Sequence, residues 1–190
     1  MRKVALLLAA VIALAHSIPS VADSKTVLPE LAQNMSAGDV RKIYADHTWK
    51  WGTGGAYFGP DATFIAASGD GEDASVAAGR WLVTSGGRMC FDAFWSGTKY
   101  SASRVMTCFN HAEFKGQFFQ AKNLTGKWYV IKSAKTKPDD MISTIVSGDL
   151  VSCKFITAAN QIKLNLNAGQ LTELSRLKKA NPKCAIGKKA

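Results

Sequence analysis

Two carboxylates, Asp92 and Glu113, are the side chains of this 190-residue chain best suited to hydrolytic chemistry. A pair of carboxyl groups that flanks a glycosidic bond can act as general acid and as nucleophile or base, so a polysaccharide hydrolase is one hypothesis. Asp92 follows Phe91 in an apolar run, where a carboxylate that faces inward needs a cationic partner. Arg80 or Arg104 could be that partner, and a buried structural ion pair is the favoured interpretation of Asp92.

No familiar catalytic motif accompanies these carboxylates. The sequence contains no G-x-S-x-G elbow, no P-loop and no dinucleotide-binding fingerprint. His111 follows Asn110 in a polar stretch that we interpret as a turn with a solvated imidazole. We therefore expect a non-enzymatic protein that uses no cofactor and no metal.

The four cysteines are the next residues that could do chemistry. A hairpin folded about Lys99 would place Cys90 directly opposite Cys108. Opposed residues on antiparallel strands have Cα atoms roughly 4.5–5.5 Å apart, a separation that a disulfide accepts. Four cysteines allow three pairings. We favour Cys90–Cys108 together with Cys153–Cys184, and free buried thiols are the alternative.

Cations interleaved with aromatic residues are the best candidates for a binding surface. Aromatic faces stack on sugar rings, and cations attract carboxylates and phosphates. Alternation along the strand expected at Lys127–Ser133 places Trp128 on the buried face and Tyr129 on the exposed face. The candidate binding residues are Lys115, Lys122, Lys127, Tyr129, Lys132, Arg176, Lys178 and Lys179.

The chain is strongly basic, with a net charge of +10 at pH 7. Most of this excess lies in residues 96–190, which hold 16 basic and 5 acidic side chains. Such an asymmetry favours an acidic partner, here a polysaccharide or a lipid surface. The alternative is a basic surface that only serves solubility.

The first 22 residues have the pattern of a secretory signal peptide. Arg2 and Lys3 precede the apolar run Val4–Ala15, and Ser20–Ala22 supplies small residues before a cleavage point. A membrane span needs about 20 apolar residues, so we expect no transmembrane segment. Export to the periplasm or the medium favours disulfides and argues against nucleic acid as a partner.

Short apolar runs separated by turn residues must position these side chains. Residues 79–110 read as consecutive antiparallel strands that are split by Gly-containing turns. We predict a mainly β fold, an antiparallel meander that forms a small closed or nearly closed lipocalin-like barrel or a sandwich, with short helices near both ends. The helices are expected at 37–46, where Ser36 and Asp39 resemble a capping box, and at 170–180.

Three further segments are predicted as strands from their apolar patterns. Leu150–Ile156 and Gln161–Leu166 alternate apolar and polar residues over part of their length. Glu113–Gln120 is predicted as a single strand in which Gly116 forms a bulge.

The centre of the chain resembles a known family. A Gly-x-Trp element followed by two cysteines, within about Met35–Val130, is similar to a family of small exported alphaproteobacterial proteins filed as a domain of unknown function. This resemblance implies export and an all-β fold, and it brings no established activity. The residues that carry it are Tyr57–Phe58, Asp61–Phe64, Gly79–Trp81, Met89–Phe91 and Cys108–Phe109.

These observations divide the chain into a signal peptide (1–22), a linker (23–35), an antiparallel β domain (36–157) and a basic C-terminal segment (158–190) packed on or tethered to that domain. We expect an exported, non-enzymatic binding protein of the cell envelope that recognises an anionic polysaccharide or a lipid headgroup. The alternatives are a barrel that carries a small apolar ligand and an envelope polysaccharide hydrolase.

Overall fold

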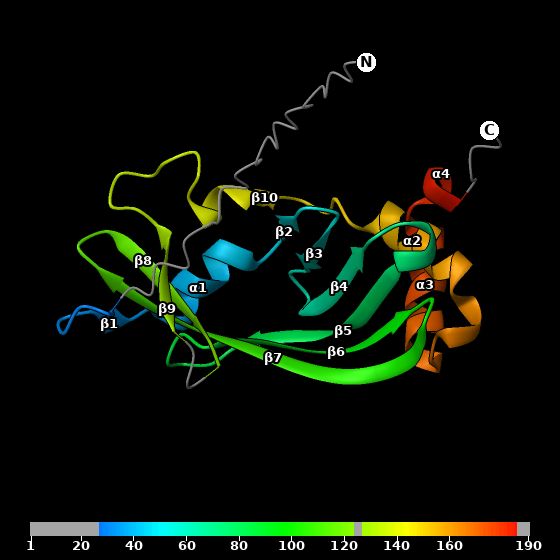
Figure 1. The fold of residues 1–190 in the computed structure, drawn as a ribbon, viewed down its shortest axis with the longest axis horizontal. Coiled ribbons are helices and arrows are strands. Elements are labelled where there is room, and N and C mark those ends of the chain that lie inside the picture. The colour runs from blue at the N-terminus through cyan, green and yellow to red at the C-terminus, as the bar shows by residue number, and fades with distance from the viewer. Residues whose placement is uncertain (1–26, 124–126, 186–190) are drawn as a thin grey trace, which may run out of the picture.

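The structure, a computed structural model, describes residues 27–123 and 127–185, so the predicted signal peptide lies outside the described residues. The described chain forms one antiparallel sheet (Figure 1). Its strands are β1 (Gln33–Asn34), β2 (His47–Trp51), β3 (Gly54–Phe58), β4 (Thr63–Ser68), β5 (Ser75–Val83), β6 (Met89–Gly97), β7 (Tyr100–Phe114), β8 (Gln117–Lys122), β9 (Trp128–Lys132) and β10 (Ile145–Ser147). Their order is β10-β2-β3-β4-β5-β6-β7-β8-β9, and β1 pairs with β7. The predicted antiparallel meander is confirmed.

The sheet curls into a half-barrel and does not close. Its edge strands β9 and β10 do not pair with each other, although they are consecutive in the chain. The connection between them contains the short 3-10 helix η2 (Met141–Thr144). The Asp140 carboxylate holds this connection by accepting hydrogen bonds from the backbone N–H groups of Ser133 (3.0 Å) and Lys137 (2.8 Å).

One helix, α1 (Ala37–Tyr44), lies within the curl of the sheet (Figure 1). The Ser36 side chain caps it by accepting the N–H of Asp39 at 3.1 Å, as the predicted capping motif requires. Val40 and Tyr44 are its buried residues, at the four-residue spacing that places side chains on one helical face. They belong to the inner core, whose other members are Met35, Ala56, Phe58, Phe64, Ala66, Ala77, Trp81, Met89, Ala93 and Phe109.

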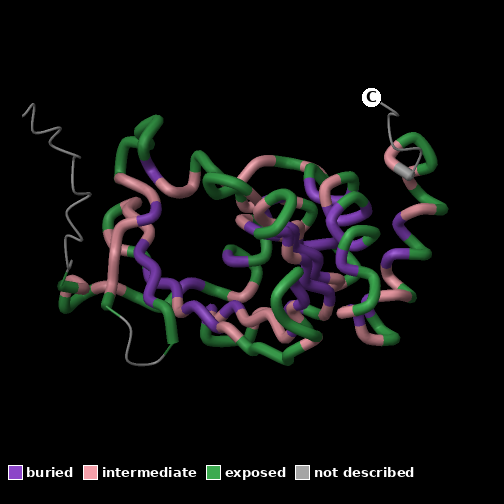
Figure 2. Tube along the Cα trace, turned by 45° about the vertical axis from the view of Figure 1, so that its right-hand side comes forward, coloured by how far each residue is buried: buried purple, intermediate pink, exposed green. Residues whose placement is uncertain are grey.

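A second core lies on the opposite, outer face of the sheet. Inner and outer residues alternate along β4 and β5, because successive strand residues point to opposite faces. The outer face is covered by α2 (Ser152–Gln161) and α3 (Ala168–Ala180), with α4 (Pro182–Ala185) following. Figure 2 shows buried residues gathered where these helices meet the sheet. The main contributors are Ile65, Val76, Val151, Phe155, Ile156, Ile162, Leu174 and Leu177.

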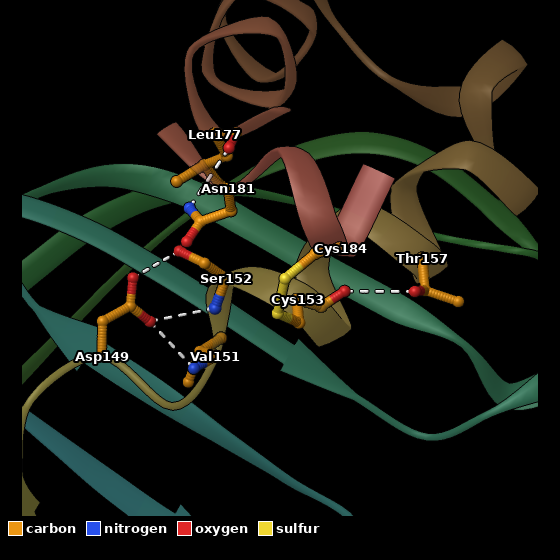
Figure 3. The surroundings of a disulfide bond; sticks show 8 residues. All are labelled: Asp149, Val151, Ser152, Cys153, Thr157, Leu177, Asn181 and Cys184. Carbon is orange, nitrogen blue, oxygen red and sulfur yellow. Dashed lines mark hydrogen bonds between the residues drawn. A yellow bond between two sulfur atoms is a disulfide. The ribbon is translucent and has the colours of Figure 1, made fainter. Parts of the chain in front are cut away.

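The strands predicted at Leu150–Ile156 and Gln161–Leu166 are wrong. The first segment enters α2, and the second is the end of α2 followed by the 3-10 helix η3 (Lys163–Asn165). The Asp149 carboxylate caps α2 by accepting the N–H groups of Val151 and Ser152, each at 2.9 Å (Figure 3). The predicted helix at 170–180 is confirmed as part of α3, and α2 spans the domain boundary expected at residue 157.

Both favoured disulfides are present. Cys90 and Cys108 are direct partners in the register of β6 and β7. Cys153 on α2 is bonded to Cys184 on α4, which ties the end of the described chain to the helical layer (Figure 3). Disulfides persist outside the cytoplasm, so their presence supports a non-cytoplasmic protein. Among the described residues, no helix is both long and apolar enough to cross a membrane.

The strand predicted over Glu113–Gln120 is also wrong, because the chain reverses within it. β7 ends at Phe114 and β8 begins at Gln117, and the two strands pair through Phe114 and Gln117. Lys115 and Gly116 form the turn with φ angles of +49° and +77°. A turn of two residues with positive φ matches the twist of a hairpin, whereas a bulge would have continued the strand.

Trp81 joins the inner core to the β3–β4 turn and gives a test of this packing. Its side chain is 1% exposed, and its indole N–H donates to the Gly59 carbonyl at 2.8 Å. We expect Trp81→Phe to lower the free energy of unfolding by about 2 kcal/mol, through lost packing and the loss of the buried indole hydrogen bond. Chemical denaturation measures this, with exposed Trp51→Phe as the control, and an unchanged unfolding midpoint would contradict it.

Candidate functional site

An open aromatic cleft lies on the inner face of the half-barrel. The cavity has a volume of about 520 Å³. This is within the range of roughly 300–1,000 Å³ that is usual for small-molecule sites. Its lining residues are Trp49, Trp51, Ala56, Phe58, Phe91, Trp95, Tyr100, Ser103, Val105, Thr107, Phe109 and Lys122.

Strand alternation brings these side chains together from β2, β3, β6, β7 and β8. Trp49 and Trp51 are two residues apart on β2 and therefore share a face, as do the odd-numbered lining residues of β6 and β7. Antiparallel pairing sets Phe91 directly opposite Thr107, and Trp95 opposite Ser103. The sequence pattern of aromatic residues at two-residue spacing was the available signal for this cleft.

Aromatic contacts make the floor of the cleft a packed surface. The rings of Phe91 and Phe64 stack with centroids 4.4 Å apart, and Trp49 meets Phe109 edge-to-face at 5.5 Å. Phe58 packs edge-to-face on Phe64 at 5.4 Å. Such geometry is favourable beyond simple area burial, so the floor is expected to keep its shape without a ligand.

The rim of the cleft is apolar and accessible. Trp51, Tyr100 and Val105 are exposed to 38%, 46% and 41% respectively. The Tyr100 ring lies against Gly97, where an added Cβ would approach to 2.6 Å, so the glycine allows the tyrosine to sit at this position. An exposed aromatic surface that lines a concavity is typical of a binding site for apolar or flat ligands.

A buried polar belt crosses the inner face next to the cleft. His111, Gln120 and Tyr129 are direct cross-strand partners on β7, β8 and β9, and Tyr44 joins them from α1. The His111 Nδ1 atom lies 3.1 Å from the Gly87 carbonyl, which can only accept, so Nδ1 carries the proton. The Nε2 atom of His111 then accepts from the Tyr44 hydroxyl at 3.0 Å.

The rest of the belt is also fully hydrogen-bonded. The Gln120 side-chain amide donates to the Tyr44 hydroxyl at 2.7 Å, and the Tyr129 hydroxyl donates to the Gln120 carbonyl oxygen. Burial lowers the pKa of His111 to about 4 and raises the pKa of Tyr129 to about 12. Burial also raises the pKa of Tyr44. These groups are therefore uncharged near neutral pH, and the belt acts as a structural wall.

A second, more polar cavity of about 560 Å³ lies on the other side of this belt. Alternate residues of β7 show that the belt separates the two cavities. Phe109 lines the cleft, His111 is in the belt and Glu113 lines the second cavity. Charged side chains of both signs surround the second cavity. Its lining includes Asp39, Lys42, His47, Glu113, Phe118 and Lys132.

The structure divides the predicted binding residues between two ends of the molecule. Figure 1 shows β8 and β9 at one end and the C-terminal helices at the other. The five residues near β8 and β9 are Lys115, Lys122, Lys127, Tyr129 and Lys132, whereas Arg176, Lys178 and Lys179 are on α3. The eight residues therefore do not form one basic patch.

Several of these residues already have partners. Lys132 donates to the Gly116 carbonyl at 3.0 Å and lies 4.7 Å from the Phe118 ring centroid. Arg176 forms an ion pair with Glu173 at 2.5 Å. The prediction that Trp128 is buried and Tyr129 exposed is wrong, because both are half-buried and the Tyr129 hydroxyl reaches the buried Gln120. Lys122 alone among the predicted cations lines the aromatic cleft.

The remaining candidates for chemistry have structural roles. Asp92 forms a bidentate ion pair with Arg104, with atom separations of 2.9 and 2.5 Å. The predicted pairing is present, but the predicted burial is wrong, because the Arg104 side chain is 67% exposed. The hydrogen bond from Arg104 lowers the pKa of Asp92. The turn predicted around His111 is wrong, since this residue is fully buried in β7. In the described part of the chain, no three potential ligands come together as a metal site.

Comparison with known proteins identifies a family for this chain, but the family has no known activity. The model of a family described as "Protein of unknown function (DUF995)" matches residues 10–151. No curated protein and no solved structure matches the chain.

Proposed function

We propose that this chain, which belongs to the DUF995 family of proteins of unknown function, binds a small apolar ligand in its aromatic cleft. The observation that carries this proposal is the cavity of about 520 Å³ whose walls are mainly aromatic and whose rim is accessible. Burial of apolar surface is the dominant favourable term in most association reactions. We place this binding outside the cytoplasm, in the periplasm or the medium, and the two disulfides support that location.

Binding of an anionic polysaccharide or lipid surface remains an alternative proposal. The net charge of +10 supports it. The separation of the predicted cations into two groups favours the cleft instead, because contacts to a single acidic chain or surface need cations that act together. The hydrolase hypothesis has the weakest support, since Asp92 is already paired with Arg104.

A charge placed in the cleft tests the proposal. We expect Val105→Glu to weaken binding of apolar probes at least about tenfold, because a carboxylate resists transfer into an apolar site. Titration with a neutral naphthylamine probe, followed by probe fluorescence, measures the affinity. Native mass spectrometry of the purified protein is expected to show a retained apolar adduct that this variant lacks.

Met106→Glu is the matched control. Met106 is the next residue of β7, points to the opposite face and is 68% exposed. The same substitution there adds the same charge to the same strand and should leave probe affinity unchanged. Equal binding by the two variants, or no binding by the unaltered protein, would refute the proposal.

A further inference from the structure

We infer that the ligand of the cleft is an amphiphile with a single negative charge, whose head is held by Lys122 while its apolar body lies on the aromatic floor. This inference rests on the proposed function and specifies its ligand class. It follows from the composition of the cleft walls, where Lys122 is the one ionisable side chain, other than the Tyr100 phenol, that the described residues contribute.

Lys122 is placed to meet a charged head at one end of the cleft. It lies at the end of β8 and is the direct cross-strand partner of Phe109, which packs on Trp49. Its side chain forms no ion pair or hydrogen bond with any residue that the structure describes. A lysine beside apolar surface can lay its methylene stem along that surface and keep its ammonium group at the water boundary.

The Thr107 hydroxyl is a second polar group in the cleft. Thr107 precedes Phe109 by two residues on β7, so its side chain shares the same face and lines the cavity. Its hydroxyl has no hydrogen-bond partner among the described side chains and can donate to an anionic head near Lys122. A carboxylate offers acceptor sites for both groups.

The apolar part of the cleft extends away from this end. From Phe109 to Ser103, β7 runs for roughly 20 Å at the rise of an extended strand. Val105 lies between these residues, and Trp95 is the partner of Ser103 across to β6. An extended alkyl chain anchored at Lys122 would lie over this surface and reach the rim residues Trp51 and Tyr100.

The charge of the cleft disfavours an amphiphile with a cationic head. No aspartate or glutamate is among the residues that line the cleft in the described chain. A cationic head would therefore meet the ammonium group of Lys122 without a compensating carboxylate. A neutral alcohol of equal chain length would gain the apolar contacts and lose the charge interaction.

The test compares three ligands of equal chain length: decanoate, decanol and decylamine. Their binding is followed through the fluorescence of the cleft tryptophans at concentrations below micelle formation. We expect decanoate to bind most tightly and decylamine most weakly. We expect Lys122→Gln to weaken decanoate binding by about fivefold, the upper end for an ion pair near the surface, and to change decanol binding less than about twofold.

Lys50→Gln is the matched control. Lys50 lies between Trp49 and Trp51 on β2, points to the outer face and is exposed. This variant removes the same charge without touching the cleft, so decanoate affinity should stay unchanged. Added salt should reduce the preference for decanoate over decanol in the unaltered protein.

The outcomes separate this inference from the proposed function. If decanol binds as tightly as decanoate and Lys122→Gln affects neither, the anionic ligand class is refuted while the apolar cleft stands. If Lys50→Gln weakens decanoate binding as much as Lys122→Gln does, the preference for decanoate comes from the overall charge of the protein, and the specific role of Lys122 is refuted. If none of the three ligands binds, both proposals fall.

Discussion

The protein is expected to lose about 2 kcal/mol of unfolding free energy when the pH falls from about 7 to about 4.5, because His111 is buried in its neutral form. The pKa of His111 is lowered to about 4, mainly by burial, from an ordinary value of 6.5. The unfolded chain therefore binds a proton at a higher pH than the folded chain does. The stability due to neutral His111 is complete above about pH 6.5 and is lost as the pH falls toward 4.

The hydrogen bonds of the belt explain why protonation is unfavourable. Nδ1 already donates to the Gly87 carbonyl, so a second proton would sit on Nε2. That atom accepts from the Tyr44 hydroxyl and also lies 2.9 Å from the Gln120 side-chain amide. A protonated Nε2 would be a donor that faces two other donors, the Tyr44 hydroxyl and the Gln120 amide. Protonation would also place a charge in the core, which costs free energy unless the charge is paired.

Two variants make the prediction specific. His111→Asn can keep a donor toward Gly87 but has no titrating ring, so it should be less stable near pH 7 and should show little change down to about pH 4.5. His47→Asn, on β2, should keep the pH dependence of the unaltered protein. Denaturant unfolding at several pH values measures all three proteins. An unaltered pH dependence in His111→Asn would contradict the assignment.

Replacing Cys153 and Cys184 with serine is expected to lower the unfolding free energy by about 3 kcal/mol, because the closed loop no longer restricts the unfolded chain. The two cysteines are separated by 31 residues, and the loop contains the whole of α3. α3 packs in the outer core through Leu174 and Leu177. Thermal and chemical unfolding of the double variant measure the loss.

The Cys90–Cys108 bridge supplies the comparison. It closes a loop of 18 residues between strands that already pair with each other, and its loss should cost a similar free energy, about 3 kcal/mol. Limited proteolysis separates the two cases. Cleavage should begin in α3 and α4 when Cys153 and Cys184 are replaced, and should not begin there when the hairpin bridge is removed. Equal stability of the Cys153/Cys184 variant and the unaltered protein would contradict the prediction.

Local patterns predicted much of the sheet correctly. The pairing of β6 with β7 depends on alternation and on turn residues that are close in sequence. The register that sets Cys90 opposite Cys108 could be predicted because it needs only the position of one turn. The N-terminal cap of α1 could be predicted for the same reason, since Ser36 and Asp39 are only three residues apart.

The wrong predictions concern segments whose structure depends on distant residues. Apolar residues between Val151 and Ile162 fit a strand pattern locally, but they form the face of α2 that covers the outer side of β4 and β5. Asn110 and His111 resemble a turn until the partners of His111 are known, and two of these, Tyr44 and Gln120, come from other elements. Lys115 and Gly116 were missed as a turn because lysine is an uncommon residue at positive φ.

The sequence alone predicted the antiparallel class of the fold, favoured the two disulfide pairs that are present and indicated that Asp92 pairs with a nearby arginine. Two features became visible only in the folded chain: the sheet stops short of closure, and part of its inner face is left uncovered. Each aromatic residue of the cleft looks like an ordinary core residue in its own strand. Trp49, Phe91 and Phe109 line one cleft only because β2 lies across the open half-barrel from the paired strands β6 and β7, with Lys122 at the edge of the cleft. Local spacing specifies which face a side chain occupies, whereas the distance between strands on a curled sheet depends on the whole fold.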